Sequence, residues 1–153
     1  MSREALFLLG ANLGRREETL RSAAAALGRV DGVRIQRISR LYETAPVGPS
    51  EEPYLNMAIR ARTTRSAMGL LIEAKRLEAA AGRRPGIRWG ARVLDVDLVS
   101  LAGIEVRSRW LTVPHPLMPR RPFAAAPLAD AAPCWRPVWA AMKPSPGSVK
   151  LWK

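Results

Sequence analysis

The sequence has a single cysteine, Cys134, and no apolar run long enough to cross a membrane. One cysteine excludes an internal disulfide and a metal site built from thiolates, and it fits a reducing compartment. A membrane-spanning helix needs roughly 20 consecutive apolar residues, so none is expected. The start of the chain, Met1 to Glu4, places an acidic side chain ahead of a short apolar run, unlike a signal peptide. We therefore expect a cytoplasmic protein with no membrane partner.

Acidic residues are scarce compared with basic ones. Asp and Glu number 13 against 25 Lys and Arg, which gives a formal net charge of +12 at pH 7. Such an excess favours an anionic partner: nucleic acid, an acidic membrane surface or a phosphorylated small molecule. Arginine far outnumbers lysine, and with abundant Ala and Gly this composition is explained equally well by GC-rich coding. Charge alone leaves these explanations open.

The periodicity of apolar residues predicts one domain, residues 1–153, of mixed α and β structure. It predicts strands at 6–9, 33–43, 55–61, 93–99 and 104–106, and helices at 15–27 and 66–82. Ser66 is expected to cap the second helix and Gly82 to end it. The order βαββαβ predicts an α+β, ferredoxin-like two-layer sandwich with a Pro-rich C-terminal extension. Helices would cover one face of the sheet and leave the other face free for ligands.

Two aspartates two residues apart are the most informative feature of the chain. In the alternating run 93–99, Asp95 and Asp97 share one face, and aliphatic side chains occupy the opposite face. Neighbouring carboxylates raise the energy of the fold unless a cation lies between them, and oxygen ligands suit Mg²⁺. Arg88 and Arg92, just upstream, are suited to binding phosphate oxygens. The segment therefore indicates phosphoryl transfer, although ion pairs between the aspartates and nearby arginines remain the alternative.

This segment belongs to one of seven sequence blocks that follow one another in a fixed order. They are residues 10–14, 42–48, 54–56, 78–83, 88–99, 111–116 and 121–123. Together, from about Leu6 to Pro133, they resemble the 6-hydroxymethyl-7,8-dihydropterin pyrophosphokinase family of folate biosynthesis, whose signature is satisfied by Arg88 through Val99. Residues 10–14 are interpreted as a structural turn, because no Gly-Lys-Ser/Thr follows them as in a Walker motif.

The resemblance implies an α+β fold and a reaction that moves pyrophosphate from ATP, the co-substrate, to a pterin alcohol, releasing AMP. It implies two Mg²⁺ ions, with Asp95 and Asp97 as the metal ligands. The implied catalytic residues are Asp95, Asp97, Arg83 and Arg92. The residues implied at ATP are Glu78, Arg88, Trp89, Arg92, Leu98, Thr112, His115 and Arg121. The residues implied at the pterin are Thr44, Ala45, Val47, Tyr54, Asn56 and Phe123.

Simpler roles compete with several of these assignments. Any single arginine of so basic a chain is also explained as a surface residue, Glu78 as a charge on a helix face, and each aromatic as part of the core. The chain also departs from the family pattern at Trp110, where a basic residue often faces the ATP phosphates. Arg109 beside it would point the other way in a strand. Trp135, Trp139 and Trp152, after Pro133, are interpreted as hydrophobic anchors of the tail.

Two other functions remain as alternatives to the kinase. A divergent paralogue that binds pterin or nucleotide without this reaction is supported only by Trp110. A basic nucleic-acid-binding sheet would carry a Gly/Phe-rich strand motif, but Phe7 and Phe123 are the only phenylalanines. We expect a monomer that acts on small molecules, with no nucleic-acid partner.

Overall fold

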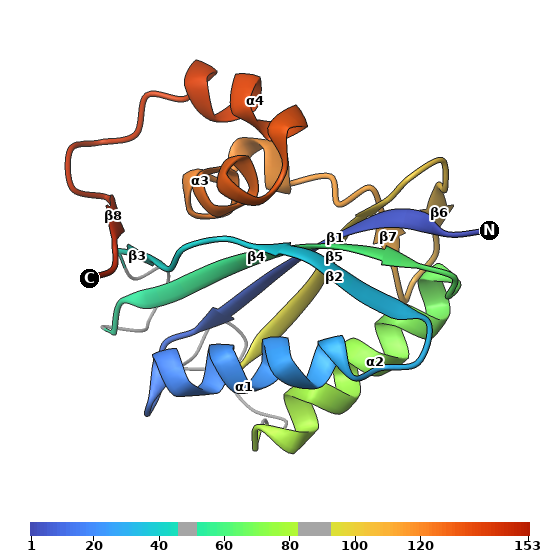
Figure 1. Cartoon of the computed structure of the whole chain (residues 1–153). Helices are drawn as coiled ribbons and strands as arrows, with labels where there is room; N and C mark the ends of the chain where they lie inside the picture. Colours follow the sequence, from blue (N-terminus) through green and yellow to red (C-terminus); the bar gives the residue numbers. More distant parts are fainter. Residues whose placement is uncertain (46–51, 83–92) are drawn as a thin grey trace.

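A six-stranded antiparallel sheet lies between two pairs of helices in the computed structural model, which describes residues 1–45, 52–82 and 93–153 (Figure 1). The strand order is β5 (Asp95–Leu101), β1 (Arg3–Ala11), β4 (Tyr54–Thr63), β3 (Tyr42–Thr44), β8 (Val149–Leu151), and β2 (Val33–Ile38) also pairs with β4. Helices α1 (Arg16–Gly28) and α2 (Ala67–Ala80) lie on one side, and α3 (Pro122–Ala131) and α4 (Arg136–Ala141) on the other (Figure 1). The smaller elements are β6 (Val106–Arg107), β7 (Thr112–Val113), η1 (Met118–Arg120) and η2 (Pro133–Trp135).

The main core fills the space between the sheet and the helices α1 and α2. Phe7 and Leu9 of β1 point into it, and Leu20 of α1 and Leu70 of α2 pack against them. These side chains recur at a period of two in the strand and at helical spacing in the helices, as the sequence predicts. Ser66 Oγ accepts a hydrogen bond of 3.0 Å from the backbone N–H of Gly69, which confirms the predicted cap.

The opposite face of the sheet carries a second, smaller core. Leu8 of β1 and Val99 of β5 pack there against Ala124 and Leu128 of α3. The prediction that this face stays free is therefore wrong over the area that α3 covers. The reason is that β1 is apolar on both faces, and α3 is so rich in alanine that it can approach the sheet closely.

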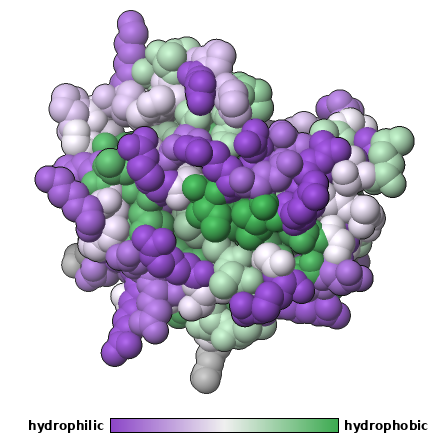
Figure 2. All heavy atoms as spheres, in the orientation of Figure 1, coloured by the Kyte–Doolittle hydropathy of each residue, from purple (hydrophilic) through white to green (hydrophobic). Residues whose placement is uncertain are grey.

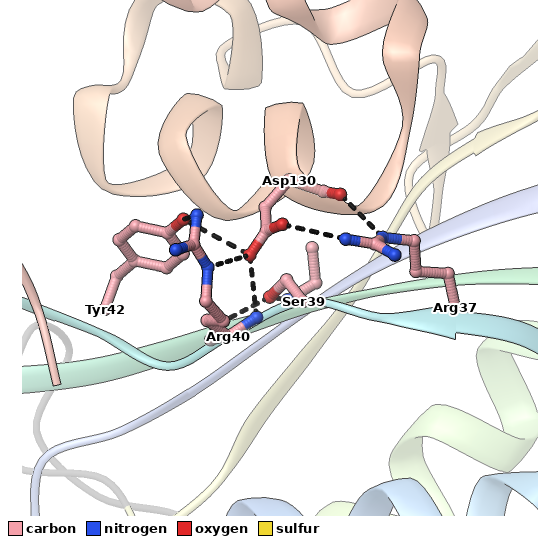
Figure 3. A network of polar contacts seen from close by, with 6 residues as sticks. Arg37, Ser39, Arg40, Tyr42 and Asp130 are labelled. Atoms are coloured by element: carbon pink, nitrogen blue, oxygen red, sulfur yellow. Dashed lines mark hydrogen bonds and ion pairs between the residues drawn. The ribbon is translucent and has the colours of Figure 1, made fainter. Parts of the chain in front are cut away.

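The predicted strand 33–43 divides into β2 and β3, because the chain breaks its pairing around Ser39. Asp130 of α3 holds this break in place (Figure 3). Its carboxylate accepts hydrogen bonds from the backbone N–H of Arg40 at 2.8 Å and the hydroxyl of Tyr42 at 3.2 Å, and it pairs with the guanidinium of Arg37 at 3.2 Å. Burial opposes ionisation, but the Arg40 and Arg37 contacts hold the pKa of Asp130 below its usual range. One carboxylate thus attaches α3 to the edge of the sheet.

Hydrophilic residues cover most of the face seen in Figure 2, and an apolar strip crosses it at the level of the sheet. None of the helices in the described part of the chain combines the length and the apolar character that a bilayer crossing requires.

Candidate active site

Four residues lie directly across from one another on the face of the sheet that carries α3. Asp95 of β5 is paired with Gly10 of β1, Gly10 with Asn56 of β4, and Asn56 with Tyr42 of β3. Residues paired in this way project to the same face, so the row joins a carboxylate to an amide. A Cβ at Gly10 would lie 3.0 Å from Asn56 Oδ1. The glycine therefore keeps the surface between Asp95 and Asn56 open, and it lies inside a strand rather than in the predicted turn.

The acidic pair alternates with the core as the sequence predicts. Val96 and Leu98 are 3% exposed and point into the main core, whereas Asp95 and Asp97 are half-buried on the opposite face. Burial, followed by the negative charges of Asp95 and Glu78, raises the pKa of Asp97 to about 7. This arrangement favours a cation beside the pair.

The acidic pair fits Mg²⁺ in the chemistry of its ligands. In the described segments, no group of three or more His, Cys, Asp and Glu side chains is placed to hold a metal ion. Two carboxylates suit Mg²⁺, which usually completes its octahedral shell with water and substrate phosphates. Asp95 and Asp97 are the residues that would hold it.

Glu78 of α2 is buried and directed at the acidic segment of β5. Its Oε1 accepts a hydrogen bond of 2.9 Å from the backbone N–H of Val96, the residue between the two aspartates. Its Oε2 pairs with Lys75 Nζ at 3.2 Å. Glu78 is therefore not an ordinary surface charge: it fixes β5 to α2, and its predicted contact with ATP stays a prediction. Lys75 is not among the predicted site residues, although it lies three residues before Glu78 on the same helix face.

His115 and Arg121 lie within electrostatic range of the acidic pair. Burial and the charge of Arg121 lower the pKa of His115, against the opposing effect of Asp95. The ring Nδ1 accepts a hydrogen bond of 3.3 Å from the backbone N–H of Leu117. The neutral ring therefore carries its proton on Nε2, where it can be donated to an anion. The Arg121 guanidinium lies 5.6 Å from the ring centre of Phe123, which places these two predicted residues side by side.

The predicted pterin residues gather at the other end of the row. Asn56 Nδ2 donates a hydrogen bond of 3.0 Å to Thr44 Oγ1, and both residues are buried. Tyr54 is paired with Thr44 across the strands, and its ring lies close to the open position at Gly10. Ala45 follows at the exposed end of β3. An edge able to donate and accept hydrogen bonds thus adjoins an aromatic ring, as a flat heterocycle requires.

An open, largely apolar groove of about 560 Å³ lies along α2. It is lined by Met68, Leu71, Ile72, Lys75, Arg76, Ala79 and Trp110. The Arg109 guanidinium lies 4.3 Å from the ring centre of Trp110, so the prediction that Arg109 points away is wrong. The reason is that residues 108–110 form a bend rather than a strand. Lys75 belongs both to the groove and to the ion pair with Glu78, so the groove adjoins the acidic segment.

The remaining predicted site residues comprise two that the structure describes and five that it does not. Thr112 is exposed on β7, and Leu98 is buried in the main core. Five predicted site residues lie outside the described part of the chain, and their roles stay predictions. They are Val47, Arg83, Arg88, Trp89 and Arg92.

Known proteins match both the sequence and the fold. Residues 6–133 match the family model of 7,8-dihydro-6-hydroxymethylpterin-pyrophosphokinase (HPPK). Over 154 aligned residues, the chain is 34% identical to 2-amino-4-hydroxy-6-hydroxymethyldihydropteridine pyrophosphokinase of Bacillus subtilis (strain 168), with 100% of this chain and 92% of that protein covered. It is 41% identical over 128 residues to the mitochondrial folate synthesis bifunctional protein of Pisum sativum, with 83% of this chain and 25% of that protein covered.

A solved structure agrees with the fold. The wild-type HPPK-DHPS of Plasmodium falciparum superimposes with a TM-score of 0.69 at 13% identity, over 92% of this chain and 41% of that one. The chain thus spans about a quarter of the pea protein and less than half of the Plasmodium protein, but nearly all of the Bacillus protein. From the family match over residues 6–133 and the identity to the Bacillus enzyme, this chain belongs to the 7,8-dihydro-6-hydroxymethylpterin-pyrophosphokinase family.

Proposed function

We propose that this chain transfers pyrophosphate from ATP to 6-hydroxymethyl-7,8-dihydropterin in folate biosynthesis, giving AMP and the pterin diphosphate. The observation that carries the proposal is the row from Asp95 through Gly10 to Asn56. In this row a carboxylate suited to a cation shares one sheet face with an amide suited to a heterocycle. The names of the family and of the Bacillus relative support the same reaction.

The domain proposal is that residues 1–153 act as one unit with a ferredoxin-like βαββαβ sandwich. The order β5-β1-β4-β2, with every neighbouring pair antiparallel, supports this connectivity. The two crossover helices, α1 and α2, lie on one side of the sheet (Figure 1). The segment after β7 then forms the C-terminal extension.

The pterin ring is proposed to bind at the β3–β4 end of the row. Asn56 donates and accepts hydrogen bonds at the ring edge, and its bond to Thr44 holds the amide in one orientation. Tyr54 and Phe123 provide aromatic surface for the flat ring. Gly10 leaves the surface beneath it open, because a side chain there would meet the amide of Asn56.

The triphosphate is proposed to lie at the β5 end. Asp95 and Asp97 would hold two Mg²⁺ ions, which would supply neutralisation of the negative charge on the phosphates. Arg121 and the Nε2–H of His115 donate to phosphate oxygens, since both lie near the acidic pair. The nucleoside would lie toward the groove on α2, whose apolar lining suits a base and whose Lys75 adjoins Glu78.

These residues act mainly by positioning the two substrates. The hydroxymethyl oxygen of the pterin forms a bond to the β-phosphorus of ATP, and its proton is released to water. The bond from that phosphorus to the oxygen bridging it to the α-phosphate breaks, and AMP leaves with that oxygen. Asn56 fixes the direction from which the hydroxymethyl group approaches, and Glu78 holds the aspartates against α2.

The test is AMP release by the purified protein with ATP, Mg²⁺ and the pterin. We expect AMP in proportion to pterin consumed, and rates reduced at least 100-fold in Asp95→Ala and Asp97→Ala. Pterin-independent AMP, or none at all, would refute the proposed reaction. The latter result, together with nucleotide binding, would favour a paralogue without the activity.

A monomeric state and a cytoplasmic location complete the proposal. The single cysteine supports a reducing compartment, whereas the pea relative is named as mitochondrial. Light scattering of the purified chain and fractionation of the source cells test these two points.

A further inference from the structure

The end of the chain adds a strand to the pterin side of the sheet. β8 pairs with β3, with Val149 opposite Thr44. The backbone N–H of Ala45 donates to the carbonyl of Ser148 at 3.3 Å, and the N–H of Trp152 donates to the carbonyl of Leu41 at 2.8 Å. The three-residue strand β3 therefore has a partner on each side, β4 and β8.

Trp152 attaches this end of the chain to the first turn of α1. Its indole Nε1–H donates a hydrogen bond of 2.9 Å to Glu17 Oε2, and its ring packs against the main core. The guanidinium of Arg16 lies 5.1 Å from the centre of the ring, a distance at which cation and π system attract each other. The tryptophan thus limits the positions that the Arg16 side chain can take.

Arg16 in turn binds both strands of the pterin site. Its NH2 pairs with Glu43 Oε2 of β3 at 2.9 Å, and its NH1 donates to the carbonyl of Pro53, just before β4, at 2.9 Å. The Arg16 side chain is only 20% exposed, so these contacts are partly screened from water. One guanidinium therefore joins the last residues of β3 to the first residues of β4.

We propose that Arg16, supported by Trp152, is a positioning residue for pterin binding. Thr44 and Tyr54 directly adjoin the two residues that Arg16 binds, and Thr44 accepts the hydrogen bond that orients Asn56. Strand ends tend to fray, and a site that must be ordered on binding has lower affinity. The contacts of Arg16 order this site before the pterin arrives. The inference rests on the proposed function, and it names a residue that determines the affinity for one of the two substrates, the pterin.

A merely structural role would lower stability without separating the two substrates. The relevant measurement is therefore the pair of KM values, at a temperature where circular dichroism shows every variant folded. Arg16→Met removes both hydrogen bonds but keeps much of the aliphatic stem. Arg15→Met is the matched control, because Arg15 directly precedes the same helix and its described ion pair is with the exposed Glu18, outside the contacts of Trp152.

In Arg16→Met we expect the KM for the pterin to rise at least fivefold, with kcat and the KM for ATP within twofold of the wild type. Arg15→Met should change none of the three. Arg16→Lys should recover part of the loss, since an ammonium group can bind one of the two acceptors. An unchanged pterin KM in Arg16→Met, or an equal rise in both KM values, would overturn the inference.

Two further measurements keep the inference testable on its own. Trp152→Leu, which leaves Arg16 in place, should raise the pterin KM in the same direction as Arg16→Met, and no change would overturn the role of Trp152. The Kd of 6-hydroxymethylpterin, measured by the intrinsic fluorescence of the pterin, should rise in parallel with its KM. An unchanged Kd contradicts the positioning role even if the wild type turns over, whereas an inactive wild type contradicts the proposed function instead.

Discussion

Replacing Asp97 by Asn should stabilise the nucleotide-free protein, and more so as the pH rises. Burial and the charges of Asp95 and Glu78 raise the pKa of Asp97 from an ordinary value of 3.8 to about 7. The folded state therefore holds this proton more tightly than the unfolded state. The stability associated with that proton is fully present below pH 3.8 and is lost as the pH rises to about 7. Asn carries no charge, so the variant does not suffer this loss.

The shift sets an upper limit on the effect. At about 1.4 kcal/mol per pKa unit, ionising Asp97 in the fold costs at most about 4 kcal/mol above pH 7, and relaxation of the site reduces this to about 1–4 kcal/mol. At pH 4.5 the cost of ionising Asp97 is at most about 1 kcal/mol, because this pH lies only slightly above the ordinary pKa of 3.8. The stability gained by Asp97→Asn should therefore grow by about 1–3 kcal/mol between pH 4.5 and pH 8.

Urea unfolding in the presence of EDTA, at pH 4.5 and pH 8, measures this difference. Asp31→Asn is a suitable control, because Asp31 is exposed in a turn far along the chain from the acidic pair. Mg²⁺ with a non-hydrolysable ATP analogue should stabilise the wild type more at pH 8 than at pH 4.5. If Asp97→Asn gains the same stability at both pH values, or loses stability at pH 8, the electrostatic account of the acidic pair is wrong.

Three further substitutions test other parts of the site. Gly10→Ala should raise the pterin KM by about tenfold, which corresponds to roughly 1.4 kcal/mol of binding free energy. The reason is that the new Cβ would lie 3.0 Å from Asn56 Oδ1. An unchanged KM would show that the pterin does not bind at the row. Asp130→Ala should lower the free energy of unfolding by about 2–4 kcal/mol, because it leaves nearby guanidiniums and a backbone N–H without their carboxylate; a loss below about 0.5 kcal/mol would contradict its role in attaching α3. Glu78→Gln removes one of the charges that raise the pKa of Asp97. The pH midpoint of Mg²⁺-dependent nucleotide binding should therefore move to lower pH. A midpoint that does not move would contradict the electrostatic coupling between Glu78 and Asp97.

Local patterns in the sequence predicted much of this structure. The alternation around Asp95 and Asp97 gave the correct faces, because a strand buried on one side must place every second residue in the core. The cap at Ser66 was predicted correctly, since it depends only on residues within one helical turn. Asn56 was placed on the correct side of its strand for the same reason as the aspartates.

Contacts between distant parts of the chain could not be predicted in this way. Asp130 binds Arg40 across 90 residues, and Trp152 binds Glu17 across 135. Neither pair has a local sequence signal, because each depends on where whole elements dock. The covering of the second sheet face by α3 was missed for the same reason: an alanine-rich segment is compatible with many partners. The sequence indicates only a hydrophobic anchor at Trp152, and its polar contacts follow from the fold alone.

The row from Asp95 to Asn56 crosses two steps between neighbouring strands, β5 to β1 and β1 to β4. Each step is about 4.8 Å, so the backbone positions beneath the carboxylate and the amide are about 10 Å apart. Ladder hydrogen bonds on both sides of β1 keep that spacing nearly constant. A bisubstrate inhibitor whose linker departs much from this length would reach one end of the row at the expense of the other.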